Sequence, residues 1–131
     1  MAYQIDAPIV QKIYDFYKLY YTYIDHLPHK TREVLGRKIE VLILELLEEV
    51  GTASFMPSAE KLSRLEQAST KLDMLKLLIR LSYELKAMNQ KKYLALETPL
   101  QEIGRMLGGW IKSIQTTNPD LLGRGLSRYY R

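Results

Sequence analysis

The chain has 131 residues, no cysteine and a formal net charge of +4, which suits one domain with a hydrophobic core and excludes a disulfide framework or a thiolate metal site. Apolar residues make up 47% and charged residues 26%, so wholesale disorder is excluded as well. The first residues do not resemble a signal peptide, and the most apolar window, residues 41–47, is far shorter than the roughly 20 residues of a membrane span. We therefore expect a soluble cytoplasmic protein that needs no membrane.

The positive charge belongs to the second half of the chain. Residues 1–51 hold six Lys/Arg against eight Asp/Glu, whereas residues 52–131 hold thirteen against seven. Such a field concentrates polyanions near the surface without giving sequence specificity. On charge alone, a solvated surface and a nucleic-acid-binding surface are equally good interpretations.

The first predicted helix begins near Pro8, which suits a first helical turn, with Asp6 as a possible cap. It ends at Leu27-Pro28-His29. Apolar residues recur along it at steps of three and four, as one face of a helix requires: Ile9, Ile13, Phe16, Tyr20 and Ile24.

The second helix is predicted from about Thr31, a candidate cap, to Val50, and Gly51-Thr52 ends it. Its inner face comprises Val34, Leu35, Ile39, Leu42, Ile43, Leu46 and Val50. Three further apolar residues widen this arc beyond that of an ordinary surface helix: Val41, Leu44 and Leu47. We expect this helix to be buried on two sides, one of them a subunit interface.

The third helix is predicted from Ser58, its candidate cap, to about Met88. Its seam runs through Leu62, Leu65, Ala68, Leu72, Leu75 and Ile79, and continues with some drift through Leu78, Leu81, Leu85 and Met88. Asn89-Gln90 is the predicted turn to the last helix.

The fourth helix has the most regular pattern, with apolar residues at steps of three and four: Tyr93, Leu96, Leu100, Ile103, Leu107, Trp110 and Ile114. Pro99 is expected to bend or restart it. The bundle domain is predicted to span residues 1–117, followed by a basic tail, residues 118–131. No apolar alternation suggests a strand, so we expect an all-α, up-down-up-down four-helix bundle.

No residue pattern indicates catalysis, a metal site or a cofactor. His26 and His29 flank Pro28 in a predicted turn, where solvated side chains are favoured over ligands or acid–base groups. The glycines at 104, 108 and 109 lie on a heptad pattern and do not follow a strand, unlike a phosphate-binding loop. We predict that the chain is not an enzyme.

The three glycines of the last helix nevertheless need an explanation, since each costs about 1 kcal/mol relative to alanine inside a helix. Gly104 and Gly108 share one face, which favours close approach of a neighbouring helix over approach of a bound chain. Trp110, on the apolar seam, is predicted to be a core residue rather than a base-stacking platform.

Tyrosines crowd the first helix, where Tyr14, Tyr17 and Tyr21 make a second stripe beside the apolar one. A base-stacking surface and a subunit interface both fit this pattern. The interface is favoured because only Lys12 and Lys18 supply positive charge there.

Basic residues form rows at helical spacing on the third and fourth helices. If these helices are antiparallel neighbours, the rows can make one positive strip. We therefore predict a nucleic-acid-binding surface made of Lys61, Arg64, Lys71, Lys76, Arg80, Lys91, Arg105 and Lys112.

Three segments carry a family resemblance. Residues 103–111, Ile-Gly-Arg-Met-Leu-Gly-Gly-Trp-Ile, resemble the closing helix of Avd, the accessory variability determinant of diversity-generating retroelements. Residues 10–15 resemble the opening helix of that family and residues 71–81 its third helix. The resemblance covers about residues 8–115. A looser version of the glycine segment occurs in four-helix bundle proteins encoded in ribosomal-RNA intervening sequences.

The Avd resemblance implies a homopentameric barrel with a positive outer surface. It further implies a non-enzymatic accessory protein that binds the element's reverse transcriptase and nucleic acid during mutagenic complementary-DNA synthesis. The implied nucleic acid is the template RNA, with DNA as an additional ligand left open. Pro99 and the tail after Pro119 depart from the family pattern. The alternative is a structural or protein-interaction bundle of the intervening-sequence type with no nucleic-acid role.

Overall fold

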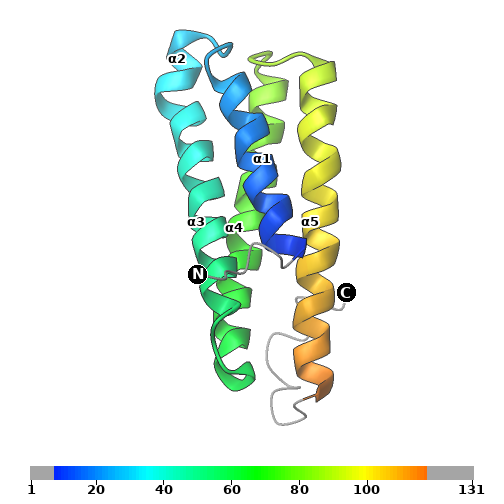
Figure 1. Cartoon of the computed structure of the whole chain (residues 1–131). Helices are drawn as coiled ribbons and strands as arrows, with labels where there is room; N and C mark the ends of the chain where they lie inside the picture. The colour runs from blue at the N-terminus through cyan, green and yellow to red at the C-terminus, as the bar shows by residue number, and fades with distance from the viewer. Residues whose placement is uncertain (1–7, 118–131) are drawn as a thin grey trace.

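The computed structural model describes residues 8–117, and this part of the chain contains helices and no strand. Three helical segments, α2, η2 and α3, follow one another without a break, so the chain forms four helical arms (Figure 1). The predicted all-α four-helix bundle is confirmed. The elements are α1 (Pro8–Ile24), α2 (His29–Thr31), the π-helix η2 (Arg32–Gly36), α3 (Arg37–Ala53), α4 (Ser58–Glu84) and α5 (Gln90–Thr117).

The arms alternate in direction and pack in a ring. Helix α1 contacts α3 and α5, and α4 contacts the same two helices, so α1 and α4 lie diagonally opposite. With 17 residues against 27 in α4 and 28 in α5, α1 covers only part of the bundle's length, as Figure 1 shows. Within residues 8–117, no helix combines the length and the apolar character that crossing a membrane requires.

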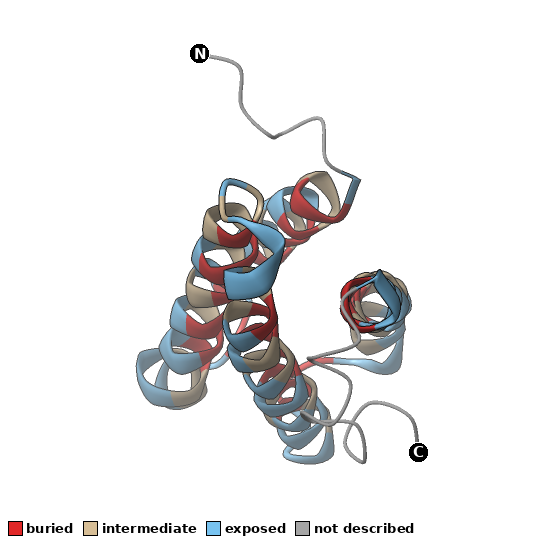
Figure 2. Ribbon diagram, turned by 90° about the horizontal axis from the view of Figure 1, so that it is seen from below, coloured by how far each residue is buried: buried red, intermediate tan, exposed pale blue. Residues whose placement is uncertain are grey.

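The core is made by one apolar stripe from each arm, turned toward the shared interior (Figure 2). Full burial of each Leu or Ile stabilises the fold by about 1.5–3 kcal/mol relative to an exposed side chain. The fully buried apolar residues include Ile13, Ile39, Ile43, Leu46, Leu62, Leu65, Leu75, Ile79, Leu96, Leu100 and Ile103.

The second arm is longer than its predicted boundaries at both ends. It begins at His29, directly after Pro28, and no side chain caps it, so the predicted Thr31 cap is wrong. It also continues through Gly51 to Ala53, which is fully buried, so the glycine does not end the helix. Burial of that last turn outweighs the low helix propensity of a single glycine.

A π turn in this arm changes which side chains point inward. Val34, predicted for the inner face, is 75% exposed, while Gly36 is buried. The Tyr20 hydroxyl donates a hydrogen bond of 2.9 Å to the Gly36 carbonyl oxygen. Because a π turn holds more residues than an α turn, it shifts the register of the apolar stripe.

Helix α4 differs from prediction at both ends. Pro57 precedes its first residue, Ser58, and no side chain caps the helix, so Ser58 is not the predicted cap. The helix ends at Glu84, and the stripe continues after Ile79 through buried Ser82. Two leucines predicted for this stripe, Leu81 and Leu85, are instead 40% and 60% exposed.

Helix α5 runs through Pro99 without a break, although proline has no N–H for the helical ladder. Ile111 is fully buried whereas Trp110 is only partly buried, so the seam passes through Ile111 and Trp110 lies at its edge. Asp6 and the predicted tail, residues 118–131, lie outside the described residues.

Candidate nucleic-acid interface

The predicted basic rows do not form one strip, because two cations of α4 turn toward α3. The Arg64 guanidinium lies 2.7 Å from a Glu49 carboxylate oxygen, and the Lys71 ammonium lies 3.4 Å from Glu45. Both carboxylates belong to α3. These two basic residues therefore bridge the α3–α4 pair, and the expectation that they line a strip with α5 is wrong.

Two other predicted cations make contacts that stabilise the bundle. The Lys61 ammonium lies 5.4 Å from the ring centre of Trp110, a cation–π contact between α4 and α5. Arg80 pairs with Glu84 at 3.0 Å, one helical turn along α4. The hydrogen bond to Glu84 raises the pKa of Arg80 above its ordinary value, so the guanidinium stays charged.

The remaining four predicted cations divide by position. Lys91 and Lys112 are exposed on α5, near its beginning and its end. Lys76 of α4 and Arg105 of α5 are brought together in one depression between the two helices, which we name the α4–α5 groove. Its volume is about 410 Å³, and it is lined by Ser69, Leu72, Asp73, Lys76, Gln101, Gly104, Arg105, Leu107 and Gly108.

The glycines of α5 keep this groove open. A β-carbon at Gly104 would lie 3.1 Å from the Lys76 ammonium, while one at Gly108 or Gly109 would meet no atom within 4 Å. Gly108 therefore does not serve close packing of a neighbouring helix, contrary to the favoured prediction. Instead, the bare backbone at Gly104 gives Lys76 room to lie across the neighbouring helix.

A model of the bAvd-like family matches residues 8–114, which include all but the last three residues of the bundle described here. The chain belongs to the bAvd-like family. None of the curated proteins compared with it gives a significant match. The family assignment agrees with the Avd resemblance of residues 10–15, 71–81 and 103–111, and it points to a retroelement accessory protein.

Next to the groove of this bAvd-like bundle, an ion pair joins α1 to α5. The Lys12 ammonium lies 2.7 Å from a Glu102 carboxylate oxygen. The hydrogen bond and the positive charge of Lys12 hold the pKa of Glu102 below its ordinary value, and Arg105 adds to the effect. The Lys12 ammonium is held in this ion pair, and Arg105 is an exposed cation on the same part of α5 as Glu102.

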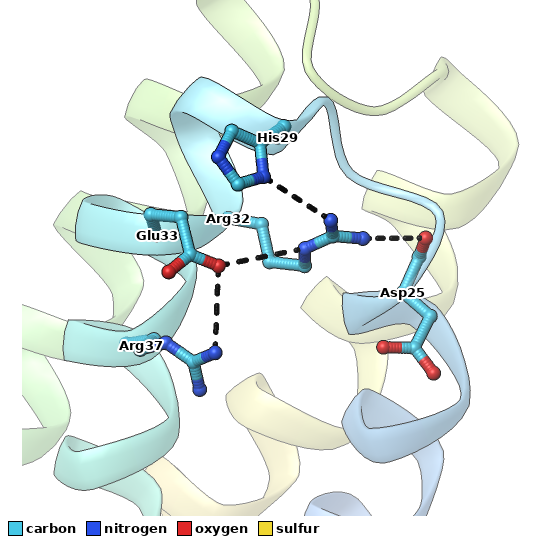
Figure 3. Close-up of polar contacts among 5 residues, drawn as sticks. All are labelled: Asp25, His29, Arg32, Glu33 and Arg37. Carbon is cyan, nitrogen blue, oxygen red and sulfur yellow. Dashed lines mark hydrogen bonds and ion pairs between the residues drawn. The ribbon is translucent and has the colours of Figure 1, made fainter.

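The two histidines of the bAvd-like chain flank Pro28, with His26 in the turn after α1 and His29 as the first residue of α2. His29 contacts the Arg32 guanidinium at 3.4 Å, and the same guanidinium donates a hydrogen bond of 3.2 Å to the Asp25 carbonyl oxygen (Figure 3). Glu33 lies between Arg32 and Arg37, at 3.9 and 3.4 Å. This network fixes the turn, and within residues 8–117 no group of three His, Asp or Glu side chains could hold a metal ion.

The tyrosine stripe of α1 is only partly free. The Tyr17 hydroxyl donates a hydrogen bond of 2.8 Å to Glu40, which raises the pKa of this phenol. Its ring lies 6.2 Å from that of Tyr21. Tyr21 and Tyr14 are 62% and 41% exposed. Tyr17 thus ties α1 to α3, while its two neighbours offer aromatic surface to solvent or a partner.

Several large apolar side chains of α3 and α4 are exposed on these two neighbouring helices. Two residues of the wide apolar arc predicted for the second helix, Val41 and Leu44, are 45% and 43% exposed. Beside them on α4, three large side chains are exposed to a similar extent: Met74, Leu77 and Leu81. We name these five residues the α3–α4 apolar face. Clusters of this kind mark interaction surfaces.

Some basic residues near a second cavity were not predicted. Lys86 and Lys92, with His26, line a cavity of about 690 Å³ at the end of the bundle. Lys86 lies within the predicted third helix, which runs to about Met88, whereas the observed helix ends at Glu84. Only its backbone conformation, with φ at +64°, sets it apart.

Proposed function

We propose that this protein is a non-catalytic accessory protein of a diversity-generating retroelement, which binds the template RNA and the element's reverse transcriptase during mutagenic complementary-DNA synthesis. The observation that carries the RNA-binding part is the α4–α5 groove, where Lys76 and Arg105 meet over a glycine-lined backbone. Membership of the bAvd-like family supports the retroelement context.

The groove suits the phosphates of a nucleic acid. Lys76 and Arg105 bring two positive charges to the groove against the single carboxylate of Asp73, and Arg105 is exposed. Lysine supplies a compact charge and arginine a planar fork that can hold two phosphate oxygens. Ser69 and Gln101 add neutral hydrogen-bonding groups at the rim. Lys91 and Lys112 extend the positive surface along α5.

One such groove gives weak binding, so we further propose that the chain assembles as a homopentamer through the α3–α4 apolar face. Repetition of the groove around a ring lets modest contacts add through multivalency. Native mass spectrometry tests this: the 15.3 kDa chain should appear at five times its mass. A monomer at micromolar concentration would contradict the assembly.

RNA binding is tested by fluorescence anisotropy with a labelled, structured RNA over a salt series. The double variant Lys76→Gln/Arg105→Gln should bind more weakly and lower the slope of log K against log[salt] by about one for each lost phosphate contact. The charge-matched control Lys18→Gln/Lys38→Gln alters two exposed lysines of α1 and α3 and should keep the wild-type slope.

Several results would count against the proposal. Wild-type protein that fails to bind RNA at low salt, or whose affinity ignores salt, would contradict the electrostatic mechanism. Equal losses in the groove variant and the control would show that only net charge matters. The reverse-transcriptase contact is tested separately, by co-purification of the two co-expressed proteins, and failure to co-purify would contradict that part alone.

A further inference from the structure

The turn after α1 and the turn after α4 lie at the same end of the bundle (Figure 1). A second cavity is lined by residues from both turns. Its volume is about 690 Å³. His26 contributes from the first turn, and Tyr83, Lys86 and Lys92 contribute from α4, the second turn and α5. Its other lining residues are Glu84, Ala87, Met88 and Asn89.

One wall of this end cavity is a fixed aromatic ring. Tyr83 stacks on Tyr93 of α5, with the ring centres 4.4 Å apart and the planes within 8° of parallel. A parallel stack covers one face of the Tyr83 ring and holds its plane, while the residue still lines the cavity. An immobilised tyrosine is a suitable platform for another flat ring.

One of the two lysines of the end cavity, Lys92, has an aromatic contact within the bundle. Lys92 lies 5.5 Å from the ring centre of Tyr23, and its backbone N–H donates to the Asn89 side chain at 2.9 Å. Glu84, the carboxylate of the cavity, is paired with Arg80 at 3.0 Å, so its charge is largely compensated. The cavity is therefore net positive.

Lys86 occupies a position where its side chain is costly to the fold. The Ala87 N–H donates to the Ser82 carbonyl and the Lys86 N–H to the Tyr83 carbonyl, both at 2.9 Å, a hydrogen-bond pattern that ends helices with a left-handed residue. Lys86 is that residue, with φ at +64°, where glycine is favoured. Within the described residues no carboxylate pairs with it, so its ammonium is available to a ligand.

From this geometry we infer that the end cavity binds an unpaired nucleotide of a single-stranded nucleic acid, with the base against Tyr83 and a phosphate between Lys86 and Lys92. The inference rests on the nucleic-acid binding proposed above and adds a preference for single strands. Lys76 of the α4–α5 groove is seven residues from Tyr83 on α4, two turns or about 11 Å away. One strand can therefore follow the groove into the cavity.

The decisive variant is Lys86→Gly, because it should move stability and binding in opposite directions. Glycine relieves the left-handed conformation, so the midpoint of urea unfolding should rise. Loss of one phosphate contact should weaken binding of a 12-nucleotide single-stranded RNA several-fold and lower its salt slope by about 0.7. Lys38→Ala, which removes an exposed lysine of α3, should leave affinity near wild type.

The base contact is tested by a second arm. Tyr83→Leu should weaken binding of the single strand roughly 5- to 150-fold, the range for losing one stacked base. An abasic oligonucleotide with the same phosphates should bind the wild type correspondingly more weakly. A blunt RNA duplex of equal length should bind the wild type and Lys86→Gly equally well.

The outcomes separate this inference from the proposed function. Lys86→Gly protein with wild-type affinity for the single strand, or equal binding of abasic and normal strands, would overturn the end-cavity site while the α4–α5 groove could still bind structured RNA. An acidic peptide that displaces the single strand from the wild type but not from Lys86→Gly would identify a protein ligand instead. A wild type that binds no nucleic acid would overturn both.

Discussion

The ammonium of Lys76 lies across the backbone of Gly104 on the neighbouring helix, 3.1 Å from where a β-carbon at position 104 would stand. The absence of a side chain at position 104 leaves room for this close approach. A β-carbon there would require the ammonium to shift by a few tenths of an ångström. The helix thus gives up local stability so that a cation can occupy this site.

The cost of a glycine inside α5 is measurable at Gly108, where an added β-carbon would meet no atom within 4 Å. We expect Gly108→Ala to raise the free energy of unfolding by about 1 kcal/mol, since alanine is the better helix former. Gly109→Ala should give a similar gain, whereas at Gly104 the shift of Lys76 should reduce it. Urea denaturation measures all three, and a destabilised Gly108→Ala variant would show that the groove is packed in solution.

The hydrogen bond from Tyr20 to the Gly36 carbonyl oxygen should be important for stability. Both groups are buried, so Tyr20→Phe leaves the carbonyl without its donor and should cost about 1–3 kcal/mol. Thermal and urea unfolding measure the loss. Tyr21→Phe, at a 62% exposed position, is the matched control and should change little. Equal stabilities of the two variants would contradict a stabilising role for the hydrogen bond from Tyr20 to Gly36.

The Lys12–Glu102 pair predicts part of the acid sensitivity of the fold. The pKa of Glu102 is lowered in the folded state, chiefly by Lys12, so the pair stabilises the fold above the unfolded pKa of about 4.3. That stabilisation is lost as the pH falls through the lower, folded-state pKa. Thermal melts from pH 6 to pH 3 should therefore show a smaller drop in midpoint for Glu102→Gln than for wild type. Glu48→Gln, at an exposed site of α3, should behave as wild type.

The α3–α4 apolar face should control assembly. Leu77→Lys and Leu81→Lys place a charge at positions that are 58% and 40% exposed, so the isolated fold should tolerate them. If the face joins subunits, burying that charge should shift the protein to monomers in sedimentation velocity. Leu94→Lys on α5, at a 51% exposed site, should keep the wild-type assembly. Identical sedimentation of all three variants would place the interface elsewhere.

Periodicity predicted the inward-facing residues well where a helix is regular. Leu96, Leu100, Ile103 and Leu107 of α5 are all buried as expected, because spacing alone determines which face of a helix they share. Trp110 differs because a large aromatic side chain at the rim of the seam can be half-buried while Ile111 fills the interior.

Contacts between helices were less predictable. The pairing of Arg64 with Glu49 depends on how α4 is rotated against α3, which the spacing within α4 does not determine. The left-handed backbone of Lys86 was equally hidden, because a glycine, not a lysine, is the sequence signal for that conformation. Lys76 and Arg105 were both predicted, but only the fold shows that they share a groove.

The π turn at Arg32–Gly36 sets a limit on the length of this segment. Deletion of one residue after Arg32 would restore regular α-helical geometry and rotate the start of this arm by about 100° relative to α1, which the bundle core holds in place. Arg32 would then swing away from the Asp25 carbonyl oxygen. A chain shortened by one residue here would therefore have to fasten the turn between its first two arms by other contacts.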